Sequence, residues 1–208
     1  HQQFTVATTA LGRTDDPVRR SGARPGDAVC VTGTLGRSGV ACRLFETGDT
    51  ERANELFRFE PRVAAGRALA PFATAMMDSS DGVARSLHQL AAASGCGIAV
   101  ESPLPFDDAV TDLANDRRER RELGLFFGED FALVCTLPAA RVTEADAATP
   151  VPLSTVGTVT EPGVTLDGDP LPDRGYSHRS CKTRAGRERG RNCGHRPGNA
   201  AGSACRST

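Results

Sequence analysis

The sequence lacks long apolar runs, and most of it lacks lysine. No apolar run approaches the roughly 20 residues that a membrane helix requires, so neither a membrane span nor a membrane partner is expected. The N-terminus has no basic region leading into an apolar stretch, so no secretory signal is predicted. Residues 1–178 carry 17 arginines and 25 acidic residues, a net charge of −8, and no lysine. This acidic body lacks the clustered positive charge that nucleic acids attract, so no nucleic-acid partner is expected.

Several motifs of common enzyme and metal sites are also missing. None of the seven cysteines forms a C-x-x-C pair, and the histidines show no zinc-ligand spacing. There is no G-x-S-x-G nucleophile elbow, and the glycine-bearing loop 32–39 has neither G-x-G-x-x-G nor a P-loop lysine. Its glycines are expected to allow close packing.

Four cysteines lie within apolar patterns, where a reduced cysteine behaves as a small buried hydrophobe: Cys30, Cys42, Cys96 and Cys135. This predicts a reducing cytoplasm.

Strand-like and helix-like segments alternate along the body, which predicts an α/β (α+β) domain with a mixed sheet and flanking helices. Strands are expected over residues 4–11, 28–32, 73–77, 97–100, 131–137, 154–159 and 164–166, with a turn at Asp167-Gly168. Helices are expected from the end of loop 33–39 to Leu44, and over 51–59, 61–69, 83–95, 109–114 and 117–123.

Residues 179–208 differ from the body in charge, in aliphatic content and in lysine usage. They contain no Val, Ile, Leu, Met, Phe, Tyr or Trp, and seven arginines and Lys182 face Glu188 alone. A segment without apolar residues cannot form a core, so it is predicted to be disordered. It is either a basic interaction tail or the product of a reading-frame slip, and the lack of repeats and charge blocks favours the slip.

The segment Asp78-Ser79-Ser80-Asp81-Gly82 lies where an apolar strand is expected to give way to a helix. In open α/β sheets, ligands bind at the carboxyl ends of strands, beside helix N-termini. Two carboxylates three residues apart at such a bend can face one Mg²⁺, which prefers oxygen ligands and leaves its other positions to water and phosphate. The alternative is that Asp81 or Ser80 merely caps the helix.

Two further polar segments are candidates for binding. Phe127-Gly128-Glu129-Asp130-Phe131 places paired acids between aromatic residues, which suits a cationic or hydroxyl-bearing group; the alternative is a solvated turn before a strand. The connector 19–27 carries an arginine fork that can hold a phosphate, or simply surface charge. Taken singly, neither segment decides between its two interpretations.

Taken in chain order, these segments resemble the thiamine-monophosphate kinase family, which is related to aminoimidazole-ribonucleotide synthetase and selenophosphate synthetase. The resemblance covers roughly residues 5–178. The order and spacing of six segments are more specific than any one of them: 20–27, 31–38, Pro61-Arg62-Val63, 73–82, Leu104-Pro105 and 128–131.

The resemblance implies ATP-dependent phosphorylation of thiamine monophosphate to thiamine diphosphate. It implies that Asp78 and Asp81 bind Mg²⁺, and that Arg20 and Ser80 contact ATP. It further implies that Glu129 and Tyr176 contact the thiamine substrate. No covalent nucleophile is expected, because phosphoryl transfer depends on positioning and charge neutralisation. The family usually has an apolar residue at the position of Ser79.

The resemblance places this chain in the C-terminal part of the family's proteins. Residues 1–20 then correspond to the last strand and connector of an N-terminal domain, and 21–178 to the C-terminal domain. In the family the N-terminal domain supplies further metal-binding aspartates and much of a homodimer interface, so this chain alone is expected to have little activity. Two alternatives are a non-catalytic assembly module using a strand edge at 4–11, and a related ligase acting on a purine precursor.

Overall fold

The computed structural model describes residues 7–9 and 11–176, and a seven-stranded mixed sheet forms its centre. The strand order is β2-β4-β1-β5-β3-β6-β7, and only the pairing of β3 with β6 is parallel. The strands are β1 Asp27–Thr32, β2 Ala75–Asp78, β3 Gly97–Val100, β4 Leu133–Pro138, β5 Leu153–Thr160, β6 Val164–Leu166 and β7 Asp169–Pro170.

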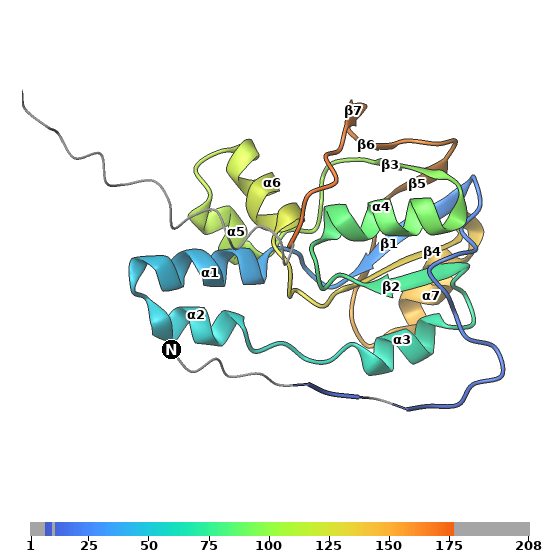
Figure 1. Cartoon of the computed structure of the whole chain (residues 1–208), viewed down its shortest axis with the longest axis horizontal. Coiled ribbons are helices and arrows are strands. Elements are labelled where there is room, and N and C mark those ends of the chain that lie inside the picture. The colour runs from blue at the N-terminus through green and yellow to red at the C-terminus, as the bar shows by residue number, and fades with distance from the viewer. Residues whose placement is uncertain (1–6, 10, 177–208) are drawn as a thin grey trace, which may run out of the picture. The chain divides into compact units, whose positions relative to one another are not determined.

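Helices cover both faces of this sheet and extend beyond one end of it (Figure 1). Helix α4 packs on one face, while α3 and α7 contact each other on the opposite face. Helices α1, α2, α5 and α6 form a separate cluster beside the sheet (Figure 1). The helices are α1 Arg37–Thr47, α2 Thr50–Leu56, α3 Val63–Leu69, α4 Val83–Ser94, α5 Asp108–Leu113, α6 Arg117–Phe126 and α7 Val142–Ala148, with a 3-10 turn η1 at Ala139–Arg141.

Strand β1 is buried on both faces, which explains its nearly continuous apolar sequence. Val29 and Val31 point into the core beneath α4, whereas Ala28 and Cys30 join the core beneath α3 and α7. Alternate residues of a strand point to opposite faces, so this one strand contributes to both cores. The cysteines of the described residues are free. Cys30 and Cys135 are buried, as the apolar patterns predicted, whereas Cys42 and Cys96 are only partly buried.

The glycines of loop 32–39 allow helix α1 to approach helix α6, which confirms the packing role expected for them. A Cβ atom at Gly39 would lie 2.5 Å from the carbonyl oxygen of Leu123, and one at Gly36 would lie 2.9 Å from the Cα of Gly124. Gly36 also has φ 94°, a conformation that favours glycine. The loop is therefore a packing element that fixes where α1 begins.

The sheet and the flanking helices confirm the predicted fold class, and most elements begin and end within a few residues of their expected bounds. The strand expected over 131–137 starts only at Leu133, because Phe131 has φ 50° and cannot continue a pleated strand. Helix α7 and strand β7 were not predicted. Residues 7–9 and 11 form no strand, since none of the described strands pairs with them; residues 4–6 and 10 lie outside the described part.

Within residues 7–9 and 11–176, no helix combines the length and the apolar character needed to cross a bilayer. The predicted basic tail, 179–208, lies outside the described residues.

Candidate functional site

The first part of the candidate site is the bend between β2 and α4. Asp78 is the last residue of β2, and Gly82, with φ 102°, precedes the first residue of α4. The Ser86 hydroxyl donates to the carbonyl oxygens of Gly82 (3.1 Å) and Asp78 (3.3 Å). The first turn of the helix therefore fixes the bend that carries both aspartates.

Neither Asp81 nor Ser80 caps α4, so that alternative is wrong. The N-cap residue is Gly82, and no side chain accepts a capping hydrogen bond from the first backbone N–H groups of the helix. Within the part of the chain that the structure describes, the carboxylates of Asp78 and Asp81 have no hydrogen-bond or ion-pair partner, although both residues are half-buried. Two such carboxylates suit Mg²⁺, which in proteins is often held by one or two carboxylates. No group of three or more potential ligand side chains occurs among these residues.

Ser79, between the two, is fully buried, and its hydroxyl has no hydrogen-bond partner among the described residues. A buried hydroxyl without a partner costs its desolvation energy, so we expect Ser79→Ala to raise the free energy of unfolding by about 1 kcal/mol. Denaturant unfolding measures this. Ser86→Ala is the matched control, since its hydroxyl is bonded; it should lower the same free energy by about 1 kcal/mol. A lower free energy of unfolding in Ser79→Ala would contradict the conclusion that the Ser79 hydroxyl is buried without a hydrogen-bond partner.

The second part of the site is the segment 127–131, whose backbone lies against the bend. The N–H of Glu129 donates to the carbonyl oxygen of Ser80 at 2.8 Å. A Cβ atom at Gly128 would lie only 2.3 Å from the same oxygen, so only glycine allows this approach. Glu129 has φ 69° and an exposed side chain. The structure therefore joins two acidic segments that are about 50 residues apart in the sequence.

The third part is the segment 175–176. The N–H of Tyr176 donates to the carbonyl oxygen of Asp81 at 2.9 Å, and a Cβ atom at Gly175 would lie 2.1 Å from that oxygen. The Tyr176 side chain is 55% exposed. Five of the six residues proposed for the site therefore belong to three backbone segments in direct contact: Asp78, Ser80, Asp81, Glu129 and Tyr176.

The hydrogen bonds of Arg20 go to helix α4 rather than to these three segments. Its guanidinium donates to the side chain of Gln89 at 3.4 Å, and its carbonyl oxygen accepts a hydrogen bond from Ser94. Both partners belong to α4, and Gln89 lies about 9 Å along the helix from its first residue at 1.5 Å per residue. The structure therefore places Arg20 beside the same helix but further from its N-terminus.

Asp130 does not act with Glu129 as a pair of substrate-facing acids. Its carboxylate accepts hydrogen bonds from the backbone N–H groups of Gly36 (2.6 Å) and Ser38 (2.9 Å) and from the Ser38 hydroxyl (2.7 Å). Burial raises the pKa of the Asp130 carboxyl, and the hydrogen bonds from Ser38 and Gly36 offset part of that effect. Its partners belong to the start of α1, so its role in the fold is structural.

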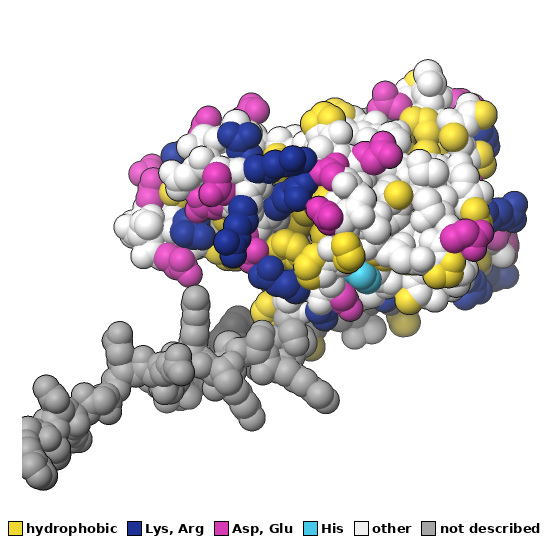
Figure 2. Space-filling view, turned by 90° about the horizontal axis from the view of Figure 1, so that it is seen from above, with side chains coloured by type: hydrophobic (Ala, Val, Ile, Leu, Met, Phe, Trp, Pro, Cys, Tyr) yellow, Lys and Arg dark blue, Asp and Glu magenta, His cyan; other side chains and the backbone are white. Residues whose placement is uncertain are grey.

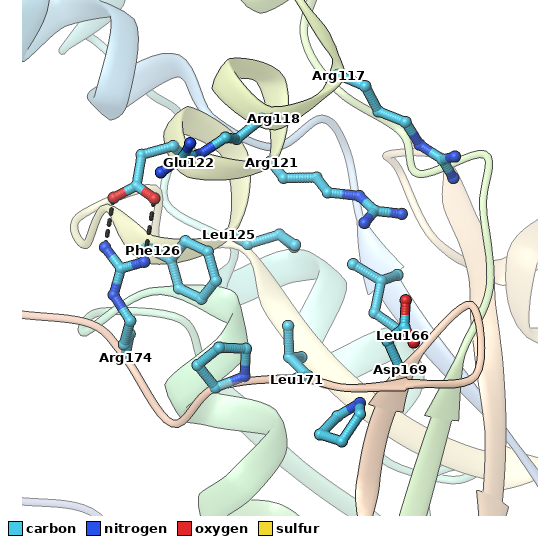
Figure 3. Close-up of a pocket in the computed structure, with 12 residues that line it drawn as sticks. Arg117, Arg118, Arg121, Glu122, Leu125, Phe126, Leu166, Asp169, Leu171 and Arg174 are labelled. Carbon is cyan, nitrogen blue, oxygen red and sulfur yellow. Dashed lines mark hydrogen bonds and ion pairs between the residues drawn. The ribbon is translucent and has the colours of Figure 1, made fainter.

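A cavity of about 430 Å³ adjoins the site on the side of Tyr176, between α6 and the segment 166–174 (Figure 3). Its apolar floor includes Leu125, Leu166 and Leu171, which are buried in the main core. Arg174 pairs with Glu122 and lies over the Phe126 ring, 4.4 Å from its centroid. The remaining basic side chains of its rim are Arg117, Arg118 and Arg121.

These arginines line one cavity. Figure 2 shows a band of basic side chains on a surface of otherwise mixed charge. Arg117 (2.7 Å) and Arg121 both pair with Asp167. Hydrogen bonds from Ser102, whose N–H donates at 2.8 Å, together with the two arginines, hold the pKa of Asp167 below its ordinary value. No motif in the sequence indicated this cluster, and Asp167 was expected only as a turn residue. The i, i+4 spacing of Arg117 and Arg121 was the signal that both face one side of α6.

Comparison with known proteins gives a consistent result. The family model described as AIR synthase related protein, C-terminal domain, matches residues 24–168. A thiamine-monophosphate kinase of Halobacterium salinarum is 60% identical over 181 residues, covering 86% of this chain and 62% of that protein. The corresponding protein of Escherichia coli K12 is 33% identical over 177 residues, covering 76% and 54%. The chain thus spans less than two thirds of the length of these relatives.

Solved structures show the same fold. A thiamine-monophosphate kinase from Stenotrophomonas maltophilia matches with a TM-score of 0.68 and 30% identity, covering 74% of this chain and 54% of that one. AaThiL complexed with AMPPCP and TMP matches with a TM-score of 0.67 and 29% identity, covering 77% and 54%. The hydrogenase maturation protein HypE of E. coli, at 24% identity and a TM-score of 0.57, shares the fold.

Proposed function

Because the chain belongs to the family of AIR synthase related proteins and carries their C-terminal domain, we propose that it is the C-terminal part of a thiamine-monophosphate kinase. Such an enzyme transfers the γ-phosphoryl group of ATP to thiamine monophosphate. The names of the relatives support this activity, as does a neighbouring structure that holds AMPPCP, an ATP analogue, together with TMP. They favour it over the purine-precursor ligase.

One observation carries the assignment of the site: two carboxylates without protein partners lie at the end of β2, where three separate segments meet. In this proposal Asp78 and Asp81 hold Mg²⁺, and the remaining ligands come from the phosphates, from water and from the N-terminal domain of the complete enzyme. The metal would neutralise charge on the phosphates that react. The hard oxygen donors of the two aspartates fit this ion.

The other residues of the site orient the two substrates. Ser80 offers a hydroxyl beside Asp81 for a phosphate oxygen of ATP, and Arg20 offers a guanidinium from the flank of α4. Glu129 presents an exposed carboxylate, which suits the positively charged thiazolium ring of thiamine monophosphate. Tyr176, whose N–H bonds to the carbonyl oxygen of Asp81, has an exposed aromatic ring, which suits stacking on the substrate.

We extend the proposal to the organisation and surroundings of the protein. Residues 1–20 correspond to the end of an N-terminal domain and 21–178 to the C-terminal domain, while 179–208 lie outside the described residues. The free cysteines of the described residues support a reducing, cytoplasmic environment. A homodimer formed largely through the upstream domain accompanies the activity.

The two aspartates provide the test. We expect Asp78→Asn and Asp81→Asn each to weaken Mg²⁺ binding by at least about tenfold, since losing even an outer-shell partner of a metal costs that much. Calorimetric titration of the chain with Mg²⁺ measures it. With the upstream region present, both variants should also lose turnover of ATP and thiamine monophosphate.

Asp116→Asn is the matched control. Asp116 is an exposed cap of α6, and asparagine caps a helix equally well, so neither Mg²⁺ binding nor turnover should change. Unchanged Mg²⁺ binding in both site variants would exclude these carboxylates as ligands. A full-length protein that folds but does not turn over thiamine monophosphate would refute the proposed activity.

A further inference from the structure

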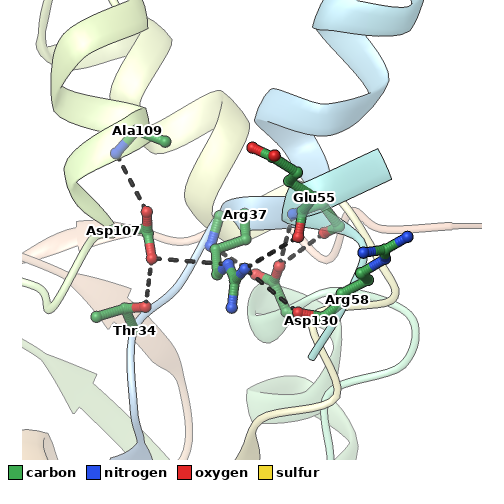
Figure 4. A network of polar contacts seen from close by, with 9 residues as sticks. Thr34, Arg37, Glu55, Arg58, Asp107, Ala109 and Asp130 are labelled. Carbon is green, nitrogen blue, oxygen red and sulfur yellow. Dashed lines mark hydrogen bonds and ion pairs between the residues drawn. The ribbon is translucent and has the colours of Figure 1, made fainter. Parts of the chain in front are cut away.

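The segment that carries Glu129 is fixed at both ends by contacts from different parts of the fold. On one side, the Glu129 N–H donates to the carbonyl oxygen of Ser80, next to the two aspartates. On the other, the Asp130 side chain reaches the start of helix α1 (Figure 4). Asp130 is thus the residue through which this segment is attached to a helix outside the site.

Helix α1 depends on this attachment because it has no cap of its own. Its N-cap residue, Gly36, has no side chain, and no cap hydrogen bond forms within the local sequence. Asp130 supplies the missing acceptors: one carboxylate oxygen accepts from the Gly36 N–H, and the other accepts from the N–H and the hydroxyl of Ser38. All three donors satisfy one carboxylate, so its position is defined from several directions.

The residues on either side of Asp130 hold unfavourable backbone conformations. Glu129 has φ 69° and Phe131 has φ 50°, in the left-handed region that non-glycine residues rarely adopt. Such conformations persist only where the surroundings impose them, and they often occur at functional sites. Here the carboxylate of Asp130 holds the middle of the segment, while the Phe131 ring stacks on Phe59 with 4.8 Å between centroids.

We propose that Asp130 is a positioning residue: by anchoring the segment to the start of α1, it holds the Glu129 carboxylate in place for the thiamine end of the substrate. This inference rests on the proposed function for the identity of the ligand. The anchoring geometry itself is independent of that function. Without the anchor, Glu129 and Phe131 relax to ordinary backbone conformations. The Glu129 side chain then moves relative to Asp78 and Asp81, which remain on their own bend.

Asp130→Ala separates positioning from folding when three measurements are made on the 208-residue protein. Thiamine monophosphate binding should weaken by roughly tenfold, since misplacing a contacting group by about 1 Å has effects of this size or larger. Mg²⁺ binding should change less than about twofold, because its ligands lie on another segment. By hydrogen exchange, the Glu129 N–H should lose protection by about tenfold, since its bond to Ser80 requires the anchored segment.

Two further variants make the result decisive. Ser38→Ala removes one of the three hydrogen-bond donors to Asp130 and should produce the same changes, but smaller ones. This milder variant keeps the test available if Asp130→Ala folds poorly. Asp116→Ala removes the cap carboxylate of α6 and should leave both the Glu129 exchange rate and thiamine monophosphate binding unchanged.

The outcomes for the two proposals are distinguishable. A wild-type chain that binds Mg²⁺ but no thiamine monophosphate, also with the upstream region present, counts against the proposed function, and the exchange of the Glu129 N–H still tests the anchor. Unchanged Glu129 protection in Asp130→Ala would overturn the positioning role. Equal weakening of Mg²⁺ and thiamine monophosphate binding would also overturn it, because a general loss of structure predicts that result.

Discussion

Replacing Gly128 by alanine is expected to lower the free energy of unfolding by about 2–3 kcal/mol, the upper part of the range for forcing an extra methyl group into a packed position. The new Cβ atom would lie 2.3 Å from the Ser80 carbonyl oxygen and 3.3 Å from its carbon. Both atoms are backbone, so no side chain can rotate away. The segments 78–82 and 127–131 must separate, and the hydrogen bond from Glu129 to Ser80 is lost.

Gly66→Ala provides the matched control for this substitution. Gly66 lies inside α3, and a Cβ atom there meets only the Leu133 side chain, at an ordinary contact distance of 3.5 Å. Alanine in a helix interior is favoured over glycine by about 0.5–1 kcal/mol, so this variant should be more stable than the wild type. Urea unfolding of both proteins gives the two values. Equal stability of Gly128→Ala and wild type would show that the two segments do not depend on their close contact.

The elements whose pattern is local were predictable from the sequence. Helix α4 follows from apolar residues at Val83, Leu87 and Leu90, and it ends at Gly95, which has the left-handed conformation of a helix C-terminus. Strand β1 follows from its apolar run, because a strand covered on both faces needs apolar residues at every position. These signals depend on near neighbours in the chain, which a single sequence displays directly.

The position of the Asp78–Gly82 segment was also predictable, because an apolar strand followed by a helical pattern places the polar residues between them at the end of a sheet. The contact between the Asp78–Gly82 bend and the Glu129 segment had no such local signal. It depends on β2 pairing with β4, which brings Asp78 opposite Leu133 and the acidic turn just before it. The resemblance to a family, rather than any spacing rule, indicated that the two segments act together.

Long-range polar contacts account for what the sequence did not show. The sequence suggests that Asp130 acts as a pair with Glu129. In the structure, its carboxylate instead accepts hydrogen bonds from Gly36 and Ser38, more than 90 residues earlier. The sequence suggests only a turn at Asp167, but its carboxylate forms ion pairs with Arg117 and Arg121 of α6. The left-handed conformations of Glu129 and Phe131 had no sequence signal, because neither residue favours them and only tertiary contacts impose them.

Truncating Leu87 to alanine should lower the free energy of unfolding by about 2–5 kcal/mol, the range found for leucine in well-packed cores. Leu87 is fully buried on the face of α4 that covers the sheet, in the same core as Val83 and Leu90. The loss leaves a cavity beneath the helix whose first turn holds the Asp78–Gly82 bend through Ser86. Denaturant unfolding, with the slope m checked for a change in cooperativity, measures this effect.

Leu11→Ala is the control for the chemistry of the substitution, because Leu11 is 97% exposed and its loss should change stability by less than about 0.5 kcal/mol. The Leu87 variant also separates the stability of the fold from the Mg²⁺ affinity of the site. Both aspartates precede helix α4, so the packing of the helix supports their bend but contributes none of the proposed metal ligands. At a low temperature, where the Leu87→Ala protein is still folded, it should therefore bind Mg²⁺ with the affinity of the wild type. A stable Leu87→Ala protein, with a loss below 1 kcal/mol, would contradict the placement of α4 over the sheet.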